Sequence, residues 1–321
     1  MEVCKDAFEL FVPSDEENKI LHELDGTYTK VSEMTNEERE FLNAIILRKK
    51  PKKLLEVGVS AGGSTVIMLN AIKSNLDSIL YSIDYSLKWY FDKTYKTGHI
   101  VDSYPDLKDK WTLFTGGLSL NFLEEIGSDI DLCLIDTVHS NPGELLDILM
   151  VFPFLKEDAI IIFHDVNCHT LSGNIAECNS LGLYTNNLLF SAIYGKKYVQ
   201  GNFKKNSPFP NQITDKTPYF PNIGAIGSCH ETRKHFFEIF NLLTLKWTYL
   251  LTETEENSII TFLSKYYDNY FIEYIKEIFV YHRECSKYPK DIVSLKYLIR
   301  EIIKKLLGKK LLEKIRKIKN G

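Results

Sequence analysis

The stretch that decides the fold is Lys53–Gly63, KLLEVGVSAGG. An apolar strand pattern runs directly into a glycine-rich turn, and a helical pattern follows over residues 64–72. A second apolar run, residues 78–83, ends in Asp84. In a strand–helix–strand unit of this kind, backbone N–H groups of the turn approach a ligand closely, and an acid at the end of the next strand binds ribose hydroxyls. The stretch therefore predicts a nucleotide-type binding site.

The residue pattern of the turn reduces the number of ligand classes that it could bind. Dinucleotide enzymes prefer G-x-G-x-x-G, whereas this turn reads E-x-G-x-S-x-G-G, with the acid on the strand itself. That pattern resembles motif I of class I S-adenosylmethionine (SAM) methyltransferases, and the position of Asp84 agrees with it. The alternative is an ordinary strand-to-helix turn of another α/β protein. The residues expected to bind SAM are Glu56, Gly58, Ser60, Gly62, Gly63, Ser64, Asp84, Tyr85, Gly116 and Gly117.

Strand and helix patterns alternate along the middle of the chain, which favours a parallel sheet with helices on both faces. The expected strands are residues 54–59, 79–84, 111–115, 131–136 and 158–164. The expected helices are residues 37–48, 64–74, 118–126 and 142–153. The predicted fold class is α/β, a doubly wound Rossmann-like methyltransferase sheet that is mostly parallel. An antiparallel edge hairpin from residues 223–229 and 244–251 is implied by the resemblance alone.

The pattern divides the chain into three parts. Residues 1–52 are an N-terminal helical lead-in whose first thirty residues read as irregular. Residues 53–254 are the SAM-binding domain, in which the aromatic-rich segment 166–222 is a lid or acceptor-binding insertion. Residues 255–321 are a helical C-terminal extension with a basic amphipathic tail. Two interpretations of the tail stay open: a helix on an anionic membrane surface or a partner, or a solvated helix packed on its own domain.

The net charge and the cysteine content limit the binding partners and the location that we expect. The chain of 321 residues has a net charge of −4 and six cysteines without a C-x-x-C pair. We therefore expect no nucleic-acid partner and a reducing, cytoplasmic location. The first residues lack a secretory pattern, and no apolar stretch is long enough to span a membrane. The expected partner is a small-molecule or glycan acceptor, with peripheral membrane contact through the tail and the oligomeric state left open.

Two further strand ends carry chemical groups: IDTVH at residues 135–139 and FHDV at residues 163–166. In an open α/β sheet, ligands bind beyond the carboxyl ends of the strands. Asp136, His139, His164 and Asp165 are therefore expected to share one crevice with the glycine-rich turn. That shared crevice is the main prediction of the sequence.

The segment LIDTVHSNPGELLDILMVFPFLKEDAIIIFHDV resembles metal-assisted O-methyltransferases of the group that includes macrolide-sugar methyltransferases and cephamycin-biosynthesis proteins (methyltransferase family 24-like). The resemblance covers residues 53–168, and residues 222–250 more loosely. It implies that Asp136, His164 and Asp165 hold a divalent cation, Mg²⁺ or Mn²⁺. It also implies that His139 removes the acceptor's proton, with Asp136 as its catalytic partner.

The chemistry is consistent with general principles. A bound divalent cation lowers the pKa of a hydroxyl, a neutral imidazole accepts its proton, and methyl transfer then depends mainly on orientation. Because magnesium prefers oxygen donors, a histidine ligand suits manganese, iron or zinc better. His164 is therefore a ligand, a residue that supports the ligands, or a residue that orients the substrate.

The predicted function is a SAM-dependent, divalent-metal-assisted O-methyltransferase acting on a sugar hydroxyl of a surface polysaccharide or a glycosylated metabolite. One alternative is an iron hydroxylase, in which His139, His164 and one aspartate form a 2-His-1-carboxylate site. The other is a methyltransferase fold without catalysis that serves as a binding subunit.

Overall fold

The computed structural model describes residues 8–166, 185–200, 222–228 and 230–286. Residues 1–272 form one compact unit and residues 273–321 a second. Most of the predicted lid and all of the basic tail beyond residue 286 lie outside the described residues. None of the described helices combines the length and apolarity needed to cross a membrane.

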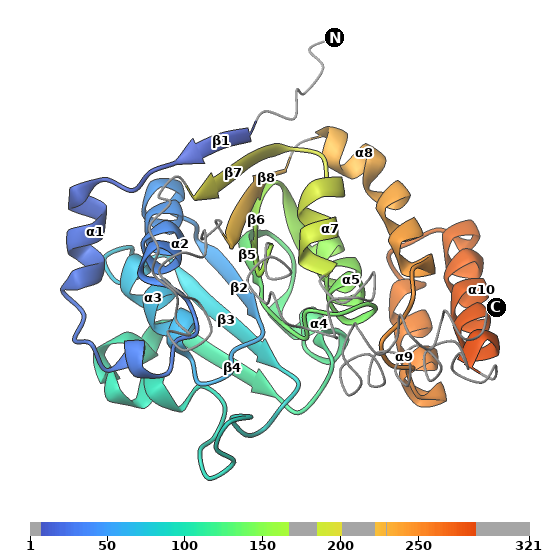
Figure 1. The fold of residues 1–321 in the computed structure, drawn as a ribbon, viewed down its shortest axis with the longest axis horizontal. Coiled ribbons are helices and arrows are strands. Elements are labelled where there is room, and N and C mark those ends of the chain that lie inside the picture. The colour runs from blue at the N-terminus through green and yellow to red at the C-terminus, as the bar shows by residue number, and fades with distance from the viewer. Residues whose placement is uncertain (1–7, 167–184, 201–221, 229, 287–321) are drawn as a thin grey trace, which may run out of the picture. The chain divides into compact units, whose positions relative to one another are not determined.

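The centre of the first unit is an eight-stranded sheet with the order β1-β7-β8-β6-β5-β2-β3-β4 (Figure 1). Its strands are β1 (Phe8–Phe11), β2 (Lys53–Val57), β3 (Ile79–Asp84), β4 (Trp111–Thr115), β5 (Ile130–Ile135), β6 (Leu155–His164), β7 (Lys196–Gln200) and β8 (Ile223–Gly227). All pairings are parallel except those of β8 with β6 and β7. The predicted mostly parallel α/β sheet is confirmed.

The edge beyond β6 differs in detail from the expectation. Strand β8 is antiparallel and lies where IGAIG predicts a strand, but residues 244–251 are not its partner. Its second neighbour is β7, which lies inside the segment assigned to the lid. Because β7 occupies the position beside β8, the apolar run around Trp247 packs elsewhere, and the backbone N–H of Thr248 donates to the carbonyl of Asn141 at 2.9 Å.

Helices cover both faces of the sheet (Figure 1). The α-helices are α1 (Asp15–His22), α2 (Asn36–Lys49), α3 (Gly63–Ile72), α4 (Leu123–Ile126), α5 (Gly143–Val151), α7 (Thr185–Ala192), α8 (His230–Ile239), α9 (Glu253–Leu263) and α10 (Asn269–Ser286). Helices α1, α2 and α3 lie on one side, and α4, α5 and α7 on the other. Short 3-10 helices are η1 (Tyr28–Lys30), η2 (His99–Ser103), η3 (Pro105–Lys110), η4 (Ser119–Asn121), η5 (Phe152–Phe154) and η7 (Phe240–Thr244).

The N-terminal part is more regular than its sequence suggests. Strand β1 and helix α1 replace the expected irregular lead-in, and a capping box at Ser14 begins α1. The predicted capping box of Thr35 with Glu38 does begin α2. In the predicted helical C-terminal extension, the described residues form two helices, α9 and α10.

The strand register places the functional strand ends side by side. Val57 of β2 is opposite both Ile83 of β3 and Ile135 of β5, and Ile135 is opposite Phe163 of β6. These strand ends are buried, as expected for strands covered on both faces. Every side chain that follows these positions therefore begins at the same edge of the sheet.

Candidate active site

A cavity of about 920 Å³ opens at this edge. It brings together most of the residues singled out in the sequence. Those that line it are Gly58, Ser60, Gly63, Ser64, Asp84, Tyr85, Gly117, Asp136, His139, His164 and Asp165. Glu56, Gly62 and Gly116 are not among the lining residues.

The glycine-rich turn passes very close to the strand end of β5. Gly58 has a φ of 93°, and a Cβ at this position would lie 1.7 Å from the carbonyl oxygen of Asp136. Only glycine fits such a position. Gly62, with a φ of 96°, is the N-cap of α3. It therefore shapes the turn from outside the cavity, and the turn and Asp136 are held against each other by backbone packing.

Asp84 binds the turn that it faces. Its Oδ2 accepts hydrogen bonds from the backbone N–H groups of Val59 at 2.9 Å and Ser60 at 3.0 Å, and its Oδ1 accepts one from Ser86 at 2.7 Å. Carboxylate oxygens have further lone pairs, so the side chain can still accept from a ligand. Sequence reasoning placed this acid at the cavity but did not anticipate that it holds the turn in shape.

Glu56 lies behind the turn. The carboxylate is fully buried and accepts hydrogen bonds from the hydroxyls of Ser64, Thr65 and Ser82 at 2.6, 2.8 and 2.7 Å. Burial raises its pKa to about 7. Its predicted role beside the cofactor becomes indirect, because Ser64 lines the cavity in its place.

The loop after β4 contributes only part of what was expected. Gly117 lines the cavity, whereas Gly116, with a φ of 85°, lies beneath the side chain of Leu87. Tyr85 is exposed at the cavity rim. At the same rim, the hydroxyl of Tyr90 donates to the carboxylate of Glu33, which joins the segment before α2 to the loop after β3.

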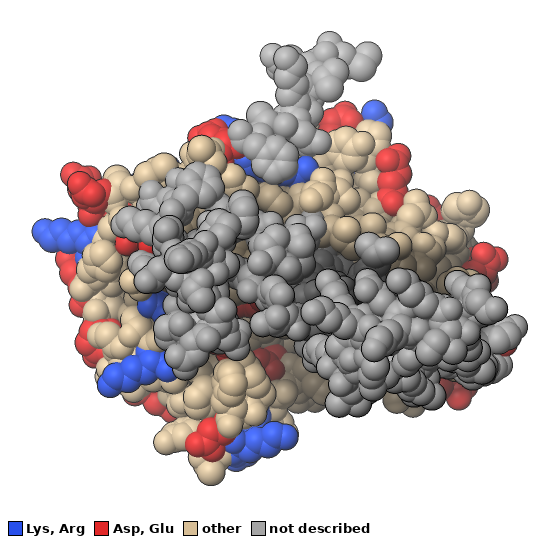
Figure 2. Space-filling view, in the orientation of Figure 1, with Lys and Arg blue, Asp and Glu red and all other residues tan. Residues whose placement is uncertain are grey.

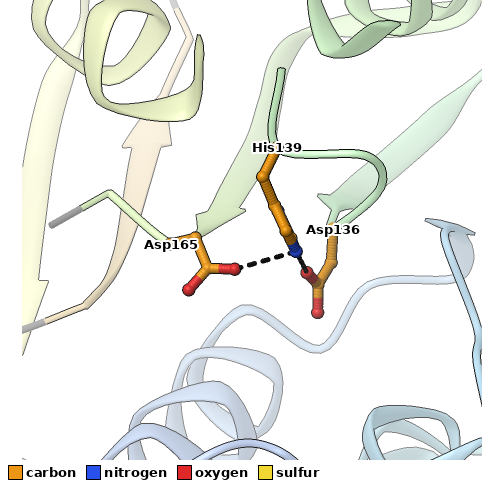
Figure 3. A group of neighbouring side chains, drawn as sticks. All are labelled: Asp136, His139 and Asp165. Atoms are coloured by element: carbon orange, nitrogen blue, oxygen red, sulfur yellow. Dashed lines mark ion pairs between the residues drawn. The ribbon is translucent and has the colours of Figure 1, made fainter. Parts of the chain in front are cut away.

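Asp136, His139 and Asp165 converge at one end of the cavity (Figure 3). His139 Nε2 lies 3.0 Å from Asp165 Oδ2 and 3.9 Å from Asp136 Oδ1. One potential ligand atom from each residue lies within 4.8 Å of the others. His139 and Asp165 have φ angles of 53° and 59°, a left-handed conformation that is uncommon for residues other than glycine and recurs at functional sites.

His164 is buried behind these three residues. Its Nδ1 lies 3.3 Å from Asp136 Oδ1 and 3.4 Å from Asp165 Oδ2, yet it makes no hydrogen bond to any described residue. Its Nε2 lies 3.5 Å from Glu38 Oε2. Burial alone would lower the pKa of His164, but Asp165 and Asp136 raise it well above its usual value.

The charges of the cluster depend on one another. Burial alone would lower the pKa of His139, but Asp165 and Glu144 raise it to about 10. Burial would raise the pKa of Asp165, but His164 and His139 hold it below its usual range. The amide of Asn222 also donates to Asp165 Oδ1 at 2.6 Å. The Asp165 carboxylate therefore stays ionised, with His164 and His139 as its positive partners.

Sequence reasoning missed Glu144 in the first turn of α5. Its fully buried Oε1 lies 3.2 Å from His139 Nδ1, and burial raises its pKa to about 7. Acids are common in the first turn of any helix, so the sequence held no distinct signal. The contact arises from the turn that carries His139 back over the start of α5.

The opposite end of the cavity is largely apolar. Its lining comes from the loop after β4, from the turn after β5, from α5 and from α9 with the segment before it, and comprises Leu118, Val138, Leu146, Met150, Tyr249, Leu250, Leu251 and Ile259. Two acids, Asp147 of α5 and Glu255 of α9, also line this part of the cavity. Ser119 and Thr137 donate hydrogen bonds at 2.8 and 3.1 Å to Asp147. Burial raises its pKa to about 6.

The family model described as a methyltransferase domain matches residues 55–166. No curated protein matches the sequence.

Solved structures with a similar fold include a putative O-methyltransferase from Klebsiella pneumoniae, at 16% identity and a TM-score of 0.43, covering 68% of this chain and 93% of that one. Another is the O-methyltransferase TomG from Streptomyces achromogenes in complex with SAM, at 12% identity and a TM-score of 0.42, covering 68% and 92%. Residues 55–166 of this chain match the model of a methyltransferase domain, and the glycine-rich turn and the strand-end acids lie within that match.

Proposed function

We propose that this protein is a SAM-dependent O-methyltransferase that uses a divalent cation and acts on a sugar hydroxyl. The observation that carries the proposal is the shared cavity. The glycine-rich turn with Asp84 lines the same cavity as Asp136, His139, His164 and Asp165. The cavity can therefore hold a methyl donor next to a group that ionises a hydroxyl.

The residues present fit SAM. The cavity volume of about 920 Å³ lies within the range of small-molecule and cofactor sites. Gly58 lines the cavity and, having no side chain, lets the turn close against the end of β5, and the apolar end offers a slot for a flat ring. When bound, SAM supplies an already activated methyl group. The turn, Asp84 and the apolar end bind and orient it.

The residues also fit a divalent cation. Asp136 and Asp165 supply carboxylate oxygens, and the buried Nδ1 of His164 beside both of them has no hydrogen bond to a described residue. An unsatisfied buried group of this kind indicates a missing ion or water. We propose these three residues as ligands, and the mixed oxygen and nitrogen donors suit manganese better than magnesium. When bound, the cation lowers the pKa of the acceptor hydroxyl.

His139 is the proposed proton acceptor. Its Nε2 points into the corner formed by Asp136 and Asp165 (Figure 3), where a hydroxyl beside the cation would lie. The acceptor oxygen forms a bond to the methyl carbon while the carbon–sulfur bond breaks. The sulfur keeps the electron pair of that bond, and His139 Nε2 takes the hydroxyl proton.

The lining also supports the class of acceptor. Lys88 is the one Lys or Arg among the described residues that line the cavity, so the cavity offers little to a polyanion. On the face shown in Figure 2, described basic and acidic side chains are interspersed. Tyr85 and Tyr90 at the rim are exposed rings of the kind that pack on the apolar faces of sugars.

Cys133 is a free thiol, which suits a proposed cytoplasmic location.

An iron hydroxylase remains a second candidate because His139 and His164 flank the same two aspartates. The two functions are separated by ligand binding. Isothermal titration of the full chain with SAM should give saturable binding, whereas Fe²⁺ with 2-oxoglutarate should give none that depends on 2-oxoglutarate.

The activity test incubates the full chain with SAM and a panel of nucleotide sugars, and reads methylated products by mass spectrometry. We expect a product with Mn²⁺ or Mg²⁺, loss of product with EDTA, and recovery when the cation is restored. Full activity in EDTA would reject the cation, and saturable 2-oxoglutarate binding without SAM binding would reject the methyltransferase.

A further inference from the structure

Glu144 is bound through both of its carboxylate oxygens. Oε1 lies 3.2 Å from His139 Nδ1, and Oε2 accepts a hydrogen bond from the backbone N–H of Asn186 at 3.1 Å. The side chain is fully buried, so no water competes for these contacts. The carboxylate therefore connects α5 to both α7 and the turn that carries His139.

Asn186 fixes the far side of this connection. Its side-chain amide donates to the carbonyl oxygen of His164 at 2.8 Å and to that of Ile135 at 3.4 Å. Asn186 is itself buried. The position of Glu144 is thus set by the ends of β5 and β6, the same strand ends that carry the aspartates of the site.

This arrangement decides which nitrogen of His139 carries a proton. The carboxylate oxygen Oε1 can only accept a hydrogen bond, and it lies 3.2 Å from His139 Nδ1. Nδ1 therefore keeps its hydrogen and donates it to Oε1. A neutral histidine has only one N–H, so the lone pair of a neutral His139 is left on Nε2, which faces the cavity.

We propose that Glu144 is a positioning residue that holds His139 with its proton on Nδ1 and leaves Nε2, which lies 3.0 Å from Asp165 Oδ2, as the nitrogen that accepts the proton of the acceptor hydroxyl. The catalytic part of this inference rests on the proposed methyltransferase function. The same logic operates wherever a carboxylate orients a catalytic or ligating histidine through its second nitrogen.

The substitution Glu144→Gln tests this role because glutamine has nearly the same shape as glutamate. It replaces one carboxylate oxygen with an NH₂ group. The buried N–H of Asn186 requires an acceptor, so the amide oxygen of the glutamine faces Asn186. Its NH₂ group then faces His139 Nδ1, which has to become an acceptor. The proton moves to Nε2, and a neutral His139 no longer accepts a proton from the cavity side.

The first measurement is the ¹⁵N chemical shift of His139 in the full chain. We expect a protonated Nδ1 in the native protein and an unprotonated Nδ1 in Glu144→Gln. Glu144→Asp keeps a carboxylate and should keep Nδ1 protonated, which provides a second variant should the glutamine variant not fold. An identical state of Nδ1 in the native protein and in the folded glutamine variant would overturn the proposal, as would loss of the Nδ1 proton in Glu144→Asp.

The second measurement is steady-state kinetics. Glu144→Gln should lower kcat about 100-fold or more, with KM for the acceptor and Kd for SAM changed less than about threefold, and Glu144→Asp should recover part of kcat. The matched control is Asp131→Asn. This acid in β5 binds Lys156 and the backbone of Lys52 and Lys53 outside the cavity, and its loss should leave kcat unchanged. A parallel fall of kcat and SAM affinity in Glu144→Gln would reduce Glu144 to a structural residue.

The two measurements separate this inference from the proposed function. If the native chain methylates no acceptor but the nitrogen shifts behave as expected, the function fails and the orientation by Glu144 stands. If methylation is observed and the Nδ1 state is unaffected by Glu144→Gln, the function stands and the inference fails.

Discussion

The two ends of the cavity are built in different ways. The charged end consists of side chains that directly follow β5 and β6, and its geometry is fixed by strand register and by left-handed residues such as His139 and Asp165. The apolar end is assembled from helices and from a distant segment, including Tyr249, Leu250 and Ile259. The family model covers residues 55–166, so it contains the charged end entirely and the apolar end only in part.

This difference separates two tasks. The charged end can take part in the reaction because the backbone at the ends of β5 and β6 fixes the positions of its acids and histidines. The sequence pattern of these strand ends predicts those positions. The apolar end determines how tightly a ligand is held, and its composition depends on segments outside the matched domain. Substitutions at the two ends should therefore change different quantities.

The largest effect is expected at the charged end. Asp136→Ala removes a carboxylate that we assign to the cation and should lower kcat by about 1,000-fold or more. The Kd for SAM, measured by titration calorimetry, should change less than about threefold. If SAM affinity falls as far as kcat, the division between a chemical end and a binding end is wrong.

The next effect concerns Glu56, which supports the turn between the two ends. Its pKa is raised to about 7 in the folded protein, above the value of an unfolded glutamate, so the folded state loses stability as the pH rises from about 4.5 through 7. Glu56→Gln should remove this loss, worth up to about 3 kcal/mol. Urea unfolding at pH 5 and pH 8 measures it.

Exposed Glu125 on α4 supplies the control for this prediction, because Glu125→Gln should leave the pH dependence unchanged. Glu144 and Asp147 have raised pKa values of the same sign, so the native protein should retain part of the dependence even without Glu56. A Glu56→Gln variant with the full native dependence would contradict the assignment.

A smaller effect is expected for Asp84. Asp84→Ala leaves three backbone N–H groups of the turn region without their acceptor, so the turn loses its shape as well as a ligand contact. SAM binding should weaken about 10- to 100-fold, from roughly two lost hydrogen bonds. Asp77→Ala, at an exposed acid before the same strand, is the control. Native SAM affinity in Asp84→Ala would remove Asp84 from the binding site.

The smallest effect belongs to the apolar end. Leu250 is 43% exposed, so Leu250→Ala should cost about 1 kcal/mol of SAM binding, roughly fivefold in Kd. Its kcat at saturating SAM should be native. Leu76, which is 90% exposed and lies outside the cavity lining, gives a control that should change neither quantity. A fall in kcat without a change in Kd would show that this end contributes to chemistry.

The sequence predicted the sheet well because its central strands are continuous apolar runs ended by acids. The crevice shared by Asp84, Asp136 and Asp165 followed from topology alone, and the cavity contains all three. Strand β7, KKYVQ, was missed because it is short and begins with two lysines. Its inward-facing Lys197 is buried, which no local pattern indicates.

The finer parts of the site depend on contacts between distant segments. The apolar run TLKWTYLL is typical of a strand, yet hydrogen bonds to Asn141 fix it in a non-strand conformation, and Trp247 is its one buried residue. In the same way, the pairing of Glu144 with His139 depends on the left-handed conformation of His139, and the hold of Asp84 on Val59 and Ser60 depends on the closed turn. Residue patterns locate such groups near one another but do not assign their partners.

Strand β1 has a consequence for how the protein is made. It is the first described element to leave the ribosome, but it pairs with β7, synthesised about 190 residues later. Strand β1 therefore has no partner until β7 has been made, and without β1 the border of the sheet at β7 stays open. Because an open border of this kind invites pairing with other chains, a shortened protein without Phe8–Phe11 should be prone to aggregation even though its catalytic groups are intact.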